Sequence, residues 1–396
     1  MSNDRPRVKL QPGGDKRAML GHPWIFSNEL VMDAAAKALP PGQIVTLVRA
    51  DGRPLGAAFF NAHSLIAARL LTRDADRAID ETFLHRRLER ALRLRERLIG
   101  APYYRLVHAE ADGIPGCVID RFGDVVVVEP NAAGADRLIE PLIASLDRLL
   151  KPRAIVISGD GPARALEGLT PVHRLAKGTL DGAIELREHG ARFLADLAEG
   201  QKTGWFYDQR DNRLLAARFA KDADVLDLYA YSGGFGVQAA RHGAKSVLSV
   251  DRSQPALDLA HRAAALNEVG DRLTTETGEA FDFLEQAGAA HHTFDLVMAD
   301  PPAFVKSRKD FHQGARAYRK LARLCASRLR NSGFLFLASC SYHMPPDEFR
   351  AQVARGLHEA GRAGRILHAT GAAPDHPVHP MLPESGYLKG LLLQVD

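Results

Sequence analysis

The sequence predicts an α/β protein with a doubly wound sheet in its C-terminal half, preceded by a small β-rich unit and an α+β segment. From about residue 222 onward, apolar runs of strand length alternate with amphipathic runs of helix length. Such alternation builds a mostly parallel sheet with helices on both faces. The beginning of the chain instead holds short apolar runs broken by Gly and Pro, which is typical of a small β unit. We therefore expect three domains, at 1–75, 76–190 and 191–396.

A hairpin is the clearest feature of the β-rich unit. Residues Gln43 to Val48 alternate between apolar and polar side chains. The chain can then turn at Asp51-Gly52, a dipeptide that favours hairpin turns, so that Leu55 to Phe60 returns as the partner strand. Ser64 to Leu71 is expected to form a further strand. A helix at 80–99, with leucines at helical spacing, then leads out of the unit.

The middle segment is expected to hold strands on both sides of a helix that spans 134–150. The strands are expected at Tyr104 to His108, Gly116 to Asp120, Val125 to Glu129, Ala154 to Ser158 and Ala183 to Arg187. Three strands in succession before the helix indicate an α+β module with an antiparallel sheet.

In the C-terminal part, strands and helices follow one another regularly. The strands are expected at Val225 to Tyr229, Ser246 to Val250, Phe294 to Ala299, Phe334 to Ser339 and Tyr387 to Val395. The helices are expected at Gly236 to His242, Pro255 to Glu268, 313–330 and 346–360. Ser253 is a plausible N-cap of the second helix, because its hydroxyl can accept a hydrogen bond from a backbone amide in the first turn.

Composition excludes several classes of protein. Of the 396 residues, 46% are hydrophobic and 25% charged, which fits a globular chain and not a disordered one. No apolar run approaches the ~18 residues of a membrane helix, and the N-terminus lacks the apolar core of a secretory signal. Three widely spaced cysteines fit neither a disulfide framework nor a zinc site. We expect a cytoplasmic, reduced protein without a metal.

The basic charge of the chain is concentrated at its N-terminal end. Residues 1–100 hold 17 Lys and Arg against 11 Asp and Glu, an excess of +6, and the remainder holds 35 against 37, a balance of −2. The excess is mostly arginine, whose planar donors suit phosphate groups. A solvated helix face explains the arginines between Arg86 and Arg97 equally well. The charge distribution therefore favours a nucleic-acid partner without requiring one.

A glycine loop and a carboxylate mark an expected cofactor site. The loop Tyr231 to Gly236 joins the first C-terminal strand to its helix, where glycines allow backbone amides to approach a ligand. Asp251 ends the next strand, where a carboxylate can accept both hydroxyls of a ribose. Gly234-x-Gly236-x-x-Ala239 also satisfies the dinucleotide fingerprint. A nicotinamide cofactor therefore stays open beside a methyl donor that contains adenosine.

Two later strand ends distinguish these cofactors. Asp300-Pro301-Pro302 follows one apolar strand, and its prolines stiffen a turn that presents the Asp300 carboxylate above the sheet edge, where a flipped base would lie. Cys340 ends the next strand, flanked by serines, so its sulfur should lie near Asp300 and can serve as a nucleophile. Cys325 lies among helical leucines and fits an ordinary buried cysteine, as does Cys117.

Nearly the whole chain resembles the bacterial 23S rRNA large-subunit cytosine-5 methyltransferases that carry an N-terminal PUA domain. The motifs that carry the resemblance are Gly21-His22-Pro23-Trp24-Ile25-Phe26-Ser27, Ala111-Asp112-Gly113-Ile114-Pro115-Gly116, Ile119-Asp120-Arg121-Phe122-Gly123, Lys202-Thr203-Gly204-Trp205-Phe206-Tyr207-Asp208-Gln209-Arg210, the glycine loop, Asp300-Pro301-Pro302, Ser339-Cys340-Ser341, Asp375-His376-Pro377-Val378 and Tyr387-Leu388-Lys389-Gly390. The segment from Lys202 to Arg210 and the last two motifs are quite specific to the family. Asp-Pro-Pro and the glycine loop occur in many methyltransferases.

The resemblance implies a PUA-like RNA-binding domain, an α+β middle domain, and a class I methyltransferase domain with a Rossmann-like fold. It implies S-adenosyl-L-methionine as cofactor and ribosomal RNA, 23S in particular, as partner. It further implies that Tyr207, Gln209 and Arg210 reach over the cofactor, that Glu279 lies near the adenine, and that Cys340 is the nucleophile. The chain departs from the family at Ala303, where relatives have Lys, and over Ser158 to Gly168.

The expected site has a catalytic part and a cofactor-binding part. The catalytic residues are Cys340 and Asp300. The cofactor-binding residues are Tyr207, Gln209, Arg210, Asp227, Tyr229, Ser232, Gly233, Gly234, Phe235, Gly236, Asp251, Ser253, Glu279, Ala280, Asp300 and Pro301. The base that would remove the proton from carbon 5 is not assigned, and Glu384 is one candidate.

Three alternative functions stay open at this point. Asp300-Pro301-Pro302 can serve methylation of a base nitrogen, for which Cys340 is dispensable. The glycine loop and Asp251 can serve a NAD-dependent oxidoreductase. The fold can also belong to an RNA-binding protein without catalysis. The sequence leaves open the target nucleotide, cytosine against uracil, the assembly stage of the RNA, and the oligomeric state, with a homodimer as one option.

Overall fold

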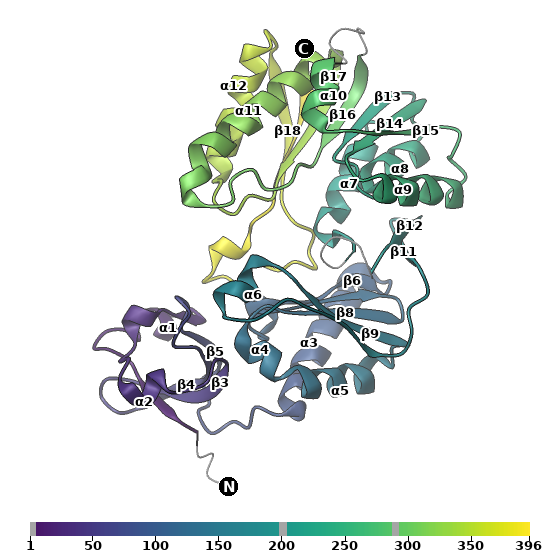
Figure 1. The fold of residues 1–396 in the computed structure, drawn as a ribbon. Helices are drawn as coiled ribbons and strands as arrows, with labels where there is room; N and C mark the ends of the chain where they lie inside the picture. Colours follow the sequence, from purple (N-terminus) through teal and green to yellow (C-terminus); the bar gives the residue numbers. More distant parts are fainter. Residues whose placement is uncertain (1–4, 198–203, 287–292) are drawn as a thin grey trace. The chain divides into compact units, whose positions relative to one another are not determined.

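The structure is a computed structural model that describes residues 5–197, 204–286 and 293–396. The chain divides into two compact units (Figure 1). The bounds of unit 1 are Met1–Gly182, Leu197–Trp205 and Pro374–Ser385, and those of unit 2 are Ala183–Asp196, Phe206–Ala373 and Gly386–Asp396. Neither unit is continuous in the sequence. Within the described residues, no helix is long and apolar enough to cross a membrane.

The N-terminal part of unit 1 is a five-stranded sheet. Its strands, in spatial order, are β1 (Arg7–Lys9), β3 (Gln43–Val48), β4 (Pro54–Phe60), β5 (Ala68–Thr72) and β2 (Trp24–Ile25). The expected hairpin is confirmed, because β3 and β4 pair antiparallel with Val45 opposite Ala58. The short helices α1 (Lys16–Met19) and α2 (Ala34–Lys37) lie in the connections. Apolar residues such as Val45 and Phe60 form a separate small core.

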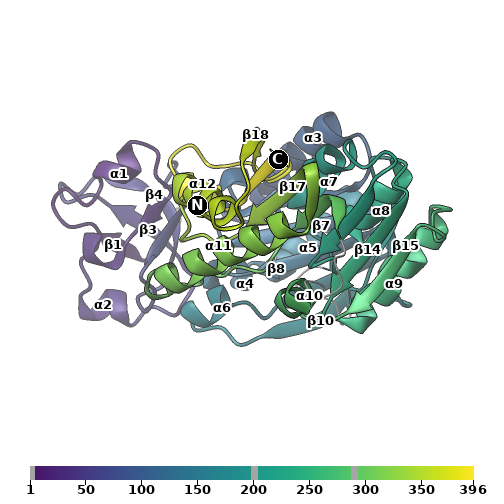
Figure 2. The same ribbon diagram turned by 90° about the horizontal axis from the view of Figure 1, so that it is seen from above.

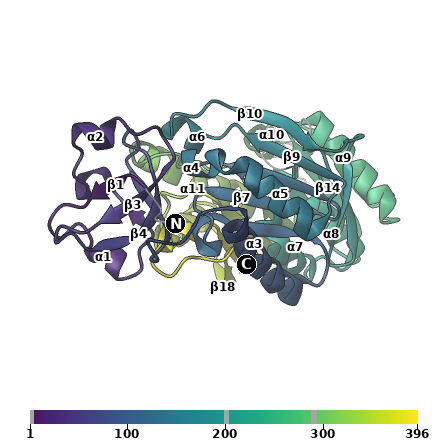
Figure 3. The ribbon, with the colours of Figure 1, turned by 90° about the horizontal axis from the view of Figure 1, so that it is seen from below.

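A second five-stranded sheet follows in unit 1. Its spatial order is β10 (Val172–Lys177), β9 (Ala154–Gly159), β8 (Val125–Pro130), β7 (Cys117–Phe122) and β6 (Tyr103–His108). The helices are α3 (Glu81–Ile99), α4 (Ala133–Arg137), α5 (Ile139–Leu150) and α6 (Pro162–Leu166). Figure 3 shows α3, α4 and α5 in front of this sheet. Their apolar faces, Leu88 and Leu146 included, share one core with the strands.

The expectation of an antiparallel sheet in this segment was wrong at one position. β8 and β9 run parallel, with Val126 opposite Ile155. The reason is the connection, because α4 and α5 lie between these strands and a helical crossover returns the chain in the same direction. The sequence order of strand, helix and strand already contained this signal.

The next two strands leave that sheet altogether. β11 (Ile184–Glu188) and β12 (Ala191–Ala195) pair with each other in a two-stranded hairpin. The strand expected at Ala183 to Arg187 is therefore present, but it belongs to unit 2 and not to the middle sheet. The strand β10, which the sequence analysis did not identify, occupies the edge of the middle sheet instead.

A buried ionic cluster explains the motif that begins at Asp375. The Arg95 side chain is fully buried, and its guanidinium donates to both carboxylate oxygens of Asp112 (2.6 and 2.7 Å) and to the Asp375 carbonyl oxygen (2.9 Å). Asp375 in turn accepts hydrogen bonds from the Arg105 amide (3.0 Å) and the His376 ring (2.9 Å). Buried charges persist when paired and hydrogen-bonded. The cluster therefore holds Pro374–Ser385 within unit 1.

Unit 2 contains a seven-stranded sheet. Its spatial order is β15 (Leu273–Thr277), β14 (Ser246–Asp251), β13 (Asp224–Leu228), β16 (Phe294–Ala299), β17 (Leu329–Ser339), β19 (Lys389–Val395) and β18 (Gly364–Thr370). The first five strands are parallel, and β19 runs antiparallel between β17 and β18. The chain moves outward from β13 to β15 and then returns beside β13 as β16. Ligands bind such sheets at this switch point, outside the carboxyl ends of the strands.

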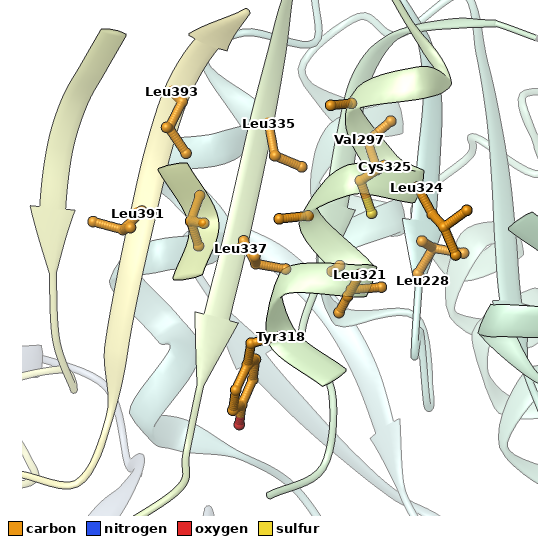
Figure 4. Close-up of a cluster of buried hydrophobic side chains, with 14 of the residues drawn as sticks. Leu228, Val297, Tyr318, Leu321, Leu324, Cys325, Leu335, Leu337, Leu391 and Leu393 are labelled. Carbon is orange, nitrogen blue, oxygen red and sulfur yellow. The ribbon is translucent and has the colours of Figure 1, made fainter. Parts of the chain in front are cut away.

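Helices cover both faces of this sheet. They are α7 (Arg210–Ala217), α8 (Gly234–Arg241), α9 (Gln254–Leu266), α10 (Ala280–Gln286), α11 (Phe311–Ser327) and α12 (Pro346–Glu359). Figure 2 shows α11 along the sheet, with α12 beside it. In the core under α11, Tyr318, Leu321 and Cys325 pack against sheet residues such as Leu337 (Figure 4). This packing fixes α11, and with it Tyr318, relative to the carboxyl ends of β16 and β17.

Candidate active site

The expected site residues come from one edge of the unit 2 sheet. Strand register aligns the ends of the central strands, since Leu228 of β13 lies opposite both Val250 and Ala299, and Ala299 lies opposite Leu337 of β17. Parallel strands in register end at a common edge. The residues at or just beyond the four strand ends are Tyr229, Asp251, Asp300 and Cys340. The structure thus brings the adenosine-binding and catalytic candidates to the same edge.

The glycine loop after β13 turns through an unusual backbone conformation. Tyr229 and Tyr231 have φ values of +60° and +48°, and Gly233 has +81°. Such values cost non-glycine residues about 1–2 kcal/mol each, so the surrounding structure must hold this loop in place. A Cβ atom at Gly234 would lie 2.5 Å from Nε of Arg213, and one at Gly236 would lie 2.6 Å from the Ser249 hydroxyl. The tight approach accounts for both glycines.

Asp251 holds this loop from the neighbouring strand. One carboxylate oxygen accepts a hydrogen bond from the Tyr231 amide (2.9 Å), and the other accepts one from the Ser253 amide (2.9 Å). A carboxylate oxygen has two lone pairs, so each retains capacity for a ribose hydroxyl. Ser253 is the N-cap of α9, as expected, since its hydroxyl accepts from the Ala256 amide. The glycine loop and the start of α9 therefore fix the carboxylate in place.

Asp227 lies underneath the loop. Its side chain is 1% exposed, and its carboxyl group accepts a hydrogen bond from the Gly236 amide at 2.8 Å. The pKa of this carboxyl is raised to about 8, mainly by burial and in part by the charges of Asp251 and Asp300, against the lowering effect of the Gly236 hydrogen bond. We infer that Asp227 supports a cofactor through the loop, because its carboxyl group is hydrogen-bonded to the Gly236 amide beneath the loop.

We predict that Asp227→Asn retains the fold at neutral pH and removes one contribution to the pH dependence of the free energy of unfolding. The folded protein keeps the Asp227 proton up to about pH 8, whereas an unfolded chain loses it near the ordinary pKa of 3.8. Between these values the folded state holds one proton more, so the free energy of unfolding falls as pH rises, by up to about 1.4 kcal/mol per pH unit. Asparagine, which is neutral throughout, should remove this slope.

Urea unfolding of both proteins at several pH values between 4.5 and 7.5, in steps of about one unit, measures this difference. The comparison variant is Asp227→Ala, which also removes the acceptor for the Gly236 amide and should cost about 1–3 kcal/mol at every pH. An Asp227→Asn variant whose stability keeps the same pH slope as the wild type would contradict a neutral carboxyl at this position.

Tyr207, Gln209 and Arg210 form the turn that leads into α7, and all three are buried. The Arg210 guanidinium lies 5.3 Å from the centre of the Tyr207 ring. Asn212 donates to Oε1 of Gln209 at 2.6 Å, which fixes the Gln209 amide. Lys202 and Thr203, at the start of the family motif that includes these residues, lie outside the described residues.

Sequence analysis missed the pair that supports this turn. Arg213 donates two hydrogen bonds to Glu188 of β11 (both 2.9 Å) and one to the Phe206 carbonyl oxygen (2.7 Å). Arg213 and Glu188 are both buried, and the guanidinium is the neighbour that a Cβ atom at Gly234 would meet. The ion pair thus joins the hairpin, the turn before α7 and the glycine loop. No local pattern connects positions so far apart in sequence.

The residues at this edge fit a cofactor that contains adenosine and an amino acid. Within the described part of the chain, Nε2 of Gln209 and the hydroxyl of Ser232 are buried without a hydrogen-bond partner. Buried polar groups are normally paired, so both atoms are suited to a polar ligand. Glu279 is exposed just after β15, and the next residue, Ala280, is buried at the start of α10. Phe235 is buried in the first turn of α8.

The two loops that carry Asp300 and Cys340 are fixed to each other. The Cys340 sulfur lies 3.9 Å from the Pro301 carbonyl oxygen. The Ser341 hydroxyl accepts from the Val305 amide at 3.0 Å and lies 2.8 Å from the Tyr318 hydroxyl. The Tyr318 hydroxyl of α11 and the Ser341 hydroxyl of the cysteine loop therefore hold the two loops together. The sulfur and the Asp-Pro-Pro turn lie side by side, as the order of the strands predicted.

The other two cysteines are buried, as expected, whereas Cys340 is partly exposed. Burial raises the pKa of the Cys117 thiol, and it raises the pKa of Cys325 to about 12. Thiols with raised pKa values are poor nucleophiles at neutral pH. Glu384 is exposed in a short helical turn of unit 1. The described residues hold no group of three or more His, Cys, Asp or Glu side chains that could bind a metal ion.

Two family models match separate parts of the chain. Residues 8–73 match a family described as PUA-like domain, and residues 173–393 match the S-adenosylmethionine-dependent methyltransferases. Two similar structures are a SAM-dependent methyltransferase from Streptococcus mutans (TM-score 0.82) and a methyltransferase complexed with SAH (TM-score 0.84). Each is 20% identical and aligns over 98% of this chain and all of the other. The class I methyltransferase fold expected from the sequence is confirmed.

Curated relatives match at higher identity and over almost the full length. The ribosomal RNA large subunit methyltransferase I of Shewanella amazonensis is 38% identical over 394 residues, which cover 98% of this chain and 99% of that protein. The protein of the same name from Alteromonas mediterranea is 36% identical, with 98% of each chain covered. The chain therefore belongs to the S-adenosylmethionine-dependent methyltransferases, in the family of the proteins named ribosomal RNA large subunit methyltransferase I.

Proposed function

We propose that this protein methylates carbon 5 of a cytosine in 23S ribosomal RNA, with Cys340 as the nucleophile. The observation that carries the proposal is a partly exposed thiol at the end of β17, 3.9 Å from the Asp-Pro-Pro turn. Methylation of a base nitrogen has no need of a thiol there, whereas carbon 5 chemistry requires a nucleophile. The names of the curated relatives support ribosomal RNA of the large subunit as the substrate.

Family membership identifies S-adenosylmethionine as the methyl donor, so the nicotinamide alternative raised by the glycine loop was wrong. When bound, this cofactor supplies an electrophilic methyl group. Asp251 would hold its ribose hydroxyls, and Gln209 and Ser232 would satisfy its polar groups from buried positions. The amides at the start of α8 would face it through the glycine loop. These roles are proposals that rest on the geometry of the sheet edge.

The thiolate is needed because carbon 5 of a pyrimidine is a weak nucleophile. Addition of the Cys340 sulfur to carbon 6 forms a carbon–sulfur bond and makes carbon 5 enamine-like. Carbon 5 then takes the methyl group. Removal of its proton by a base expels the thiolate and restores the ring. Asp300 would hold the Watson–Crick edge of the base, give it a proton as the sulfur adds, and take that proton back when the thiolate leaves. A paired base cannot reach the site, so the target must be unpaired or flipped out.

We predict that cells lacking this protein lose a single 5-methylcytosine from 23S rRNA. One shaped site positions one flipped base, so a single position should lose its methyl group. Solvent cannot take the place of the missing nucleophile. Bisulfite sequencing of total rRNA, with and without the gene, measures the change. Complementation with the wild-type gene is the control. Loss of a methylated nitrogen position instead, with all 5-methylcytosines retained, would contradict the proposal and favour the alternative that uses Asp300 alone.

The N-terminal domain is proposed to grip the RNA backbone. Arg7 and Lys9 are exposed on β1 two residues apart, so their side chains leave the strand on the same side. We predict that the double variant Arg7→Ala, Lys9→Ala binds RNA more weakly and that its affinity depends less on salt. Fewer phosphate contacts release fewer counterions on binding. Filter binding at several salt concentrations measures both, with Lys37→Ala, an exposed cation of α2, as the control.

Binding of S-adenosylmethionine by the double variant should equal that of the wild type, since the two sites lie in different domains. Unchanged RNA affinity together with an unchanged salt slope would remove β1 from the RNA-binding surface. Truncation of residues 1–75 is a less direct test. It would leave the Glu110 and Glu167 carboxylates of the middle domain without Arg69, which pairs with them at 2.7 and 3.2 Å.

A further inference from the structure

Lys389 is the one charged residue of β19, a strand that is mostly apolar. It begins β19, whose next four residues are Gly and three Leu, and its side chain is only 8% exposed. Among the described residues, no carboxylate forms an ion pair with it. Burial lowers the pKa of the ammonium group from 10.5 to about 8. Burying an ammonium without a carboxylate partner is costly, so the position calls for an explanation.

The sheet places this lysine across from the cysteine loop. Lys389 lies directly opposite Ser339, the last residue of β17, in the antiparallel pair of β17 and β19. Opposite residues direct their side chains to the same face of a sheet. The ammonium group donates a hydrogen bond to the Ser341 carbonyl oxygen at 2.6 Å. Its side chain therefore spans from the residue before Cys340 to the residue after it.

The ammonium and the thiol of Cys340 are close enough for their charges to interact. The Cys340 sulfur favours the charged form of Lys389, which opposes the effect of burial on the pKa of the lysine. Such an interaction is reciprocal, so the ammonium favours the thiolate form of the cysteine by the same free energy. One of the three ammonium N–H groups is occupied by Ser341, which leaves donors for a neighbouring anion.

Other titratable groups come close to the sulfur from two further elements. Tyr318 of α11 interacts with Cys340, but burial raises its pKa, so it stays neutral. Asp300 precedes Pro301, whose carbonyl oxygen lies 3.9 Å from the sulfur. A carboxylate and a carbonyl oxygen both disfavour a thiolate. A cation beside the sulfur is the group that can offset these effects and favour the reactive thiolate.

We infer that Lys389 is a positioning residue that stabilises the thiolate of Cys340 and holds the loop that presents it. The thiol proton leaves to solvent, and the ammonium keeps all of its own protons. The importance of this interaction for methyl transfer rests on the proposed function of Cys340. The interaction itself does not, because a thiolate can be measured without RNA or methyl donor.

The test is the pH dependence of Cys340 alkylation in the full-length protein. Iodoacetamide reacts with the thiolate, whose sulfur displaces iodide, so the rate constant follows the thiolate fraction. Mass spectrometry of the peptide that contains Cys340 separates it from the buried Cys117 and Cys325. In Lys389→Met the midpoint of the profile should rise by about one pH unit or more, and the rate constant at pH 7 should fall about tenfold.

Two further variants separate charge from structure. Lys389→Gln keeps a donor for the Ser341 carbonyl oxygen but lacks the charge, so it should behave like Lys389→Met. Lys389→Arg keeps the charge and should retain a midpoint near that of the wild type. Lys320→Met, which removes a partly exposed lysine of α11 paired with Glu285, is the matched control and should leave the profile unchanged.

Two outcomes would overturn the inference and leave a purely structural lysine. One is a wild-type midpoint in Lys389→Gln, and the other is a midpoint in Lys389→Arg that is raised as far as in Lys389→Met. Thermal unfolding and S-adenosylmethionine binding show whether each variant is folded. Failure of the proposed function looks different. Cys340→Ala would then keep its methyltransferase activity, while the alkylation profiles of the lysine variants still differ from that of the wild type.

Discussion

Cys340→Ala is expected to abolish methyl transfer while leaving the fold and the binding of S-adenosylmethionine nearly intact. The loss should be about a thousandfold or more, because the variant has no sulfur to activate carbon 5. The fold should survive because the Cys340 side chain is partly exposed at the end of β17 and does not belong to the buried apolar core of unit 2. Transfer of a labelled methyl group to unmodified 23S rRNA measures activity, and calorimetry measures cofactor binding.

A covalent adduct gives a second and independent measurement of the same prediction. RNA that carries 5-fluorocytidine at the target should remain bound to the wild type, since fluorine replaces the proton that the base must remove and the thiolate cannot be expelled. A denaturing gel separates this adduct from free protein. Cys340→Ala should give no adduct with the same RNA. The blocked step follows methyl transfer, so the trapped adduct depends on the methyl donor. The experiment should therefore be run both with and without S-adenosylmethionine.

Cys117→Ala and Cys325→Ala are the matched controls. Both thiols are fully buried, and both variants should keep activity and adduct formation, at a packing cost of about 1 kcal/mol. An adduct that survives in Cys340→Ala, or full turnover by that variant, would overturn the cysteine mechanism. Methylation of a base nitrogen, supported by Asp300 and the stiff turn of Pro301 and Pro302, would then be the better description.

Asp251→Ala is expected to weaken S-adenosylmethionine binding about ten- to a hundredfold. The loss of charge-assisted hydrogen bonds to the ribose costs about 1.5–3 kcal/mol. The structure adds a second reason, because the carboxylate also anchors the Tyr231 and Ser253 amides at 2.9 Å each. The variant therefore loses both a ligand contact and the support of a loop whose backbone is strained at Tyr229 and Tyr231.

Asp251→Asn separates these two contributions. Its amide oxygen can still accept from one backbone amide, while the charge that strengthens the ribose contact is gone. An intermediate affinity is therefore expected. Asp258→Ala removes an exposed carboxylate about one turn into α9 and is the control for the loss of charge alone. Calorimetric titration gives the three affinities. Equal affinity of Asp251→Ala and the wild type would remove Asp251 from the cofactor site.

The sequence by itself determined the central strands of unit 2 and the longer helices between them. Apolar runs of strand length predicted β13, β14, β16 and β17, because a strand buried on both faces must be apolar throughout. The same runs placed Asp251, Asp300 and Cys340 at strand ends. Since parallel strands end at a common edge, this local information was enough to predict that these residues lie at the same edge of the sheet. The two edge strands β15 and β18, both largely exposed, were not identified.

Only the tertiary structure decided the contacts that connect distant parts of the chain. Nothing in the sequence around Glu188 indicates Arg213 as its partner, and Pro374–Ser385 joins unit 1 through Arg95, which lies 280 residues earlier. The role of Lys389 likewise depends on its register opposite Ser339. Hydrophobic periodicity reports whether a position is buried or exposed, but it does not report the partner. Buried charges need specific partners, and packing of the whole chain selects them.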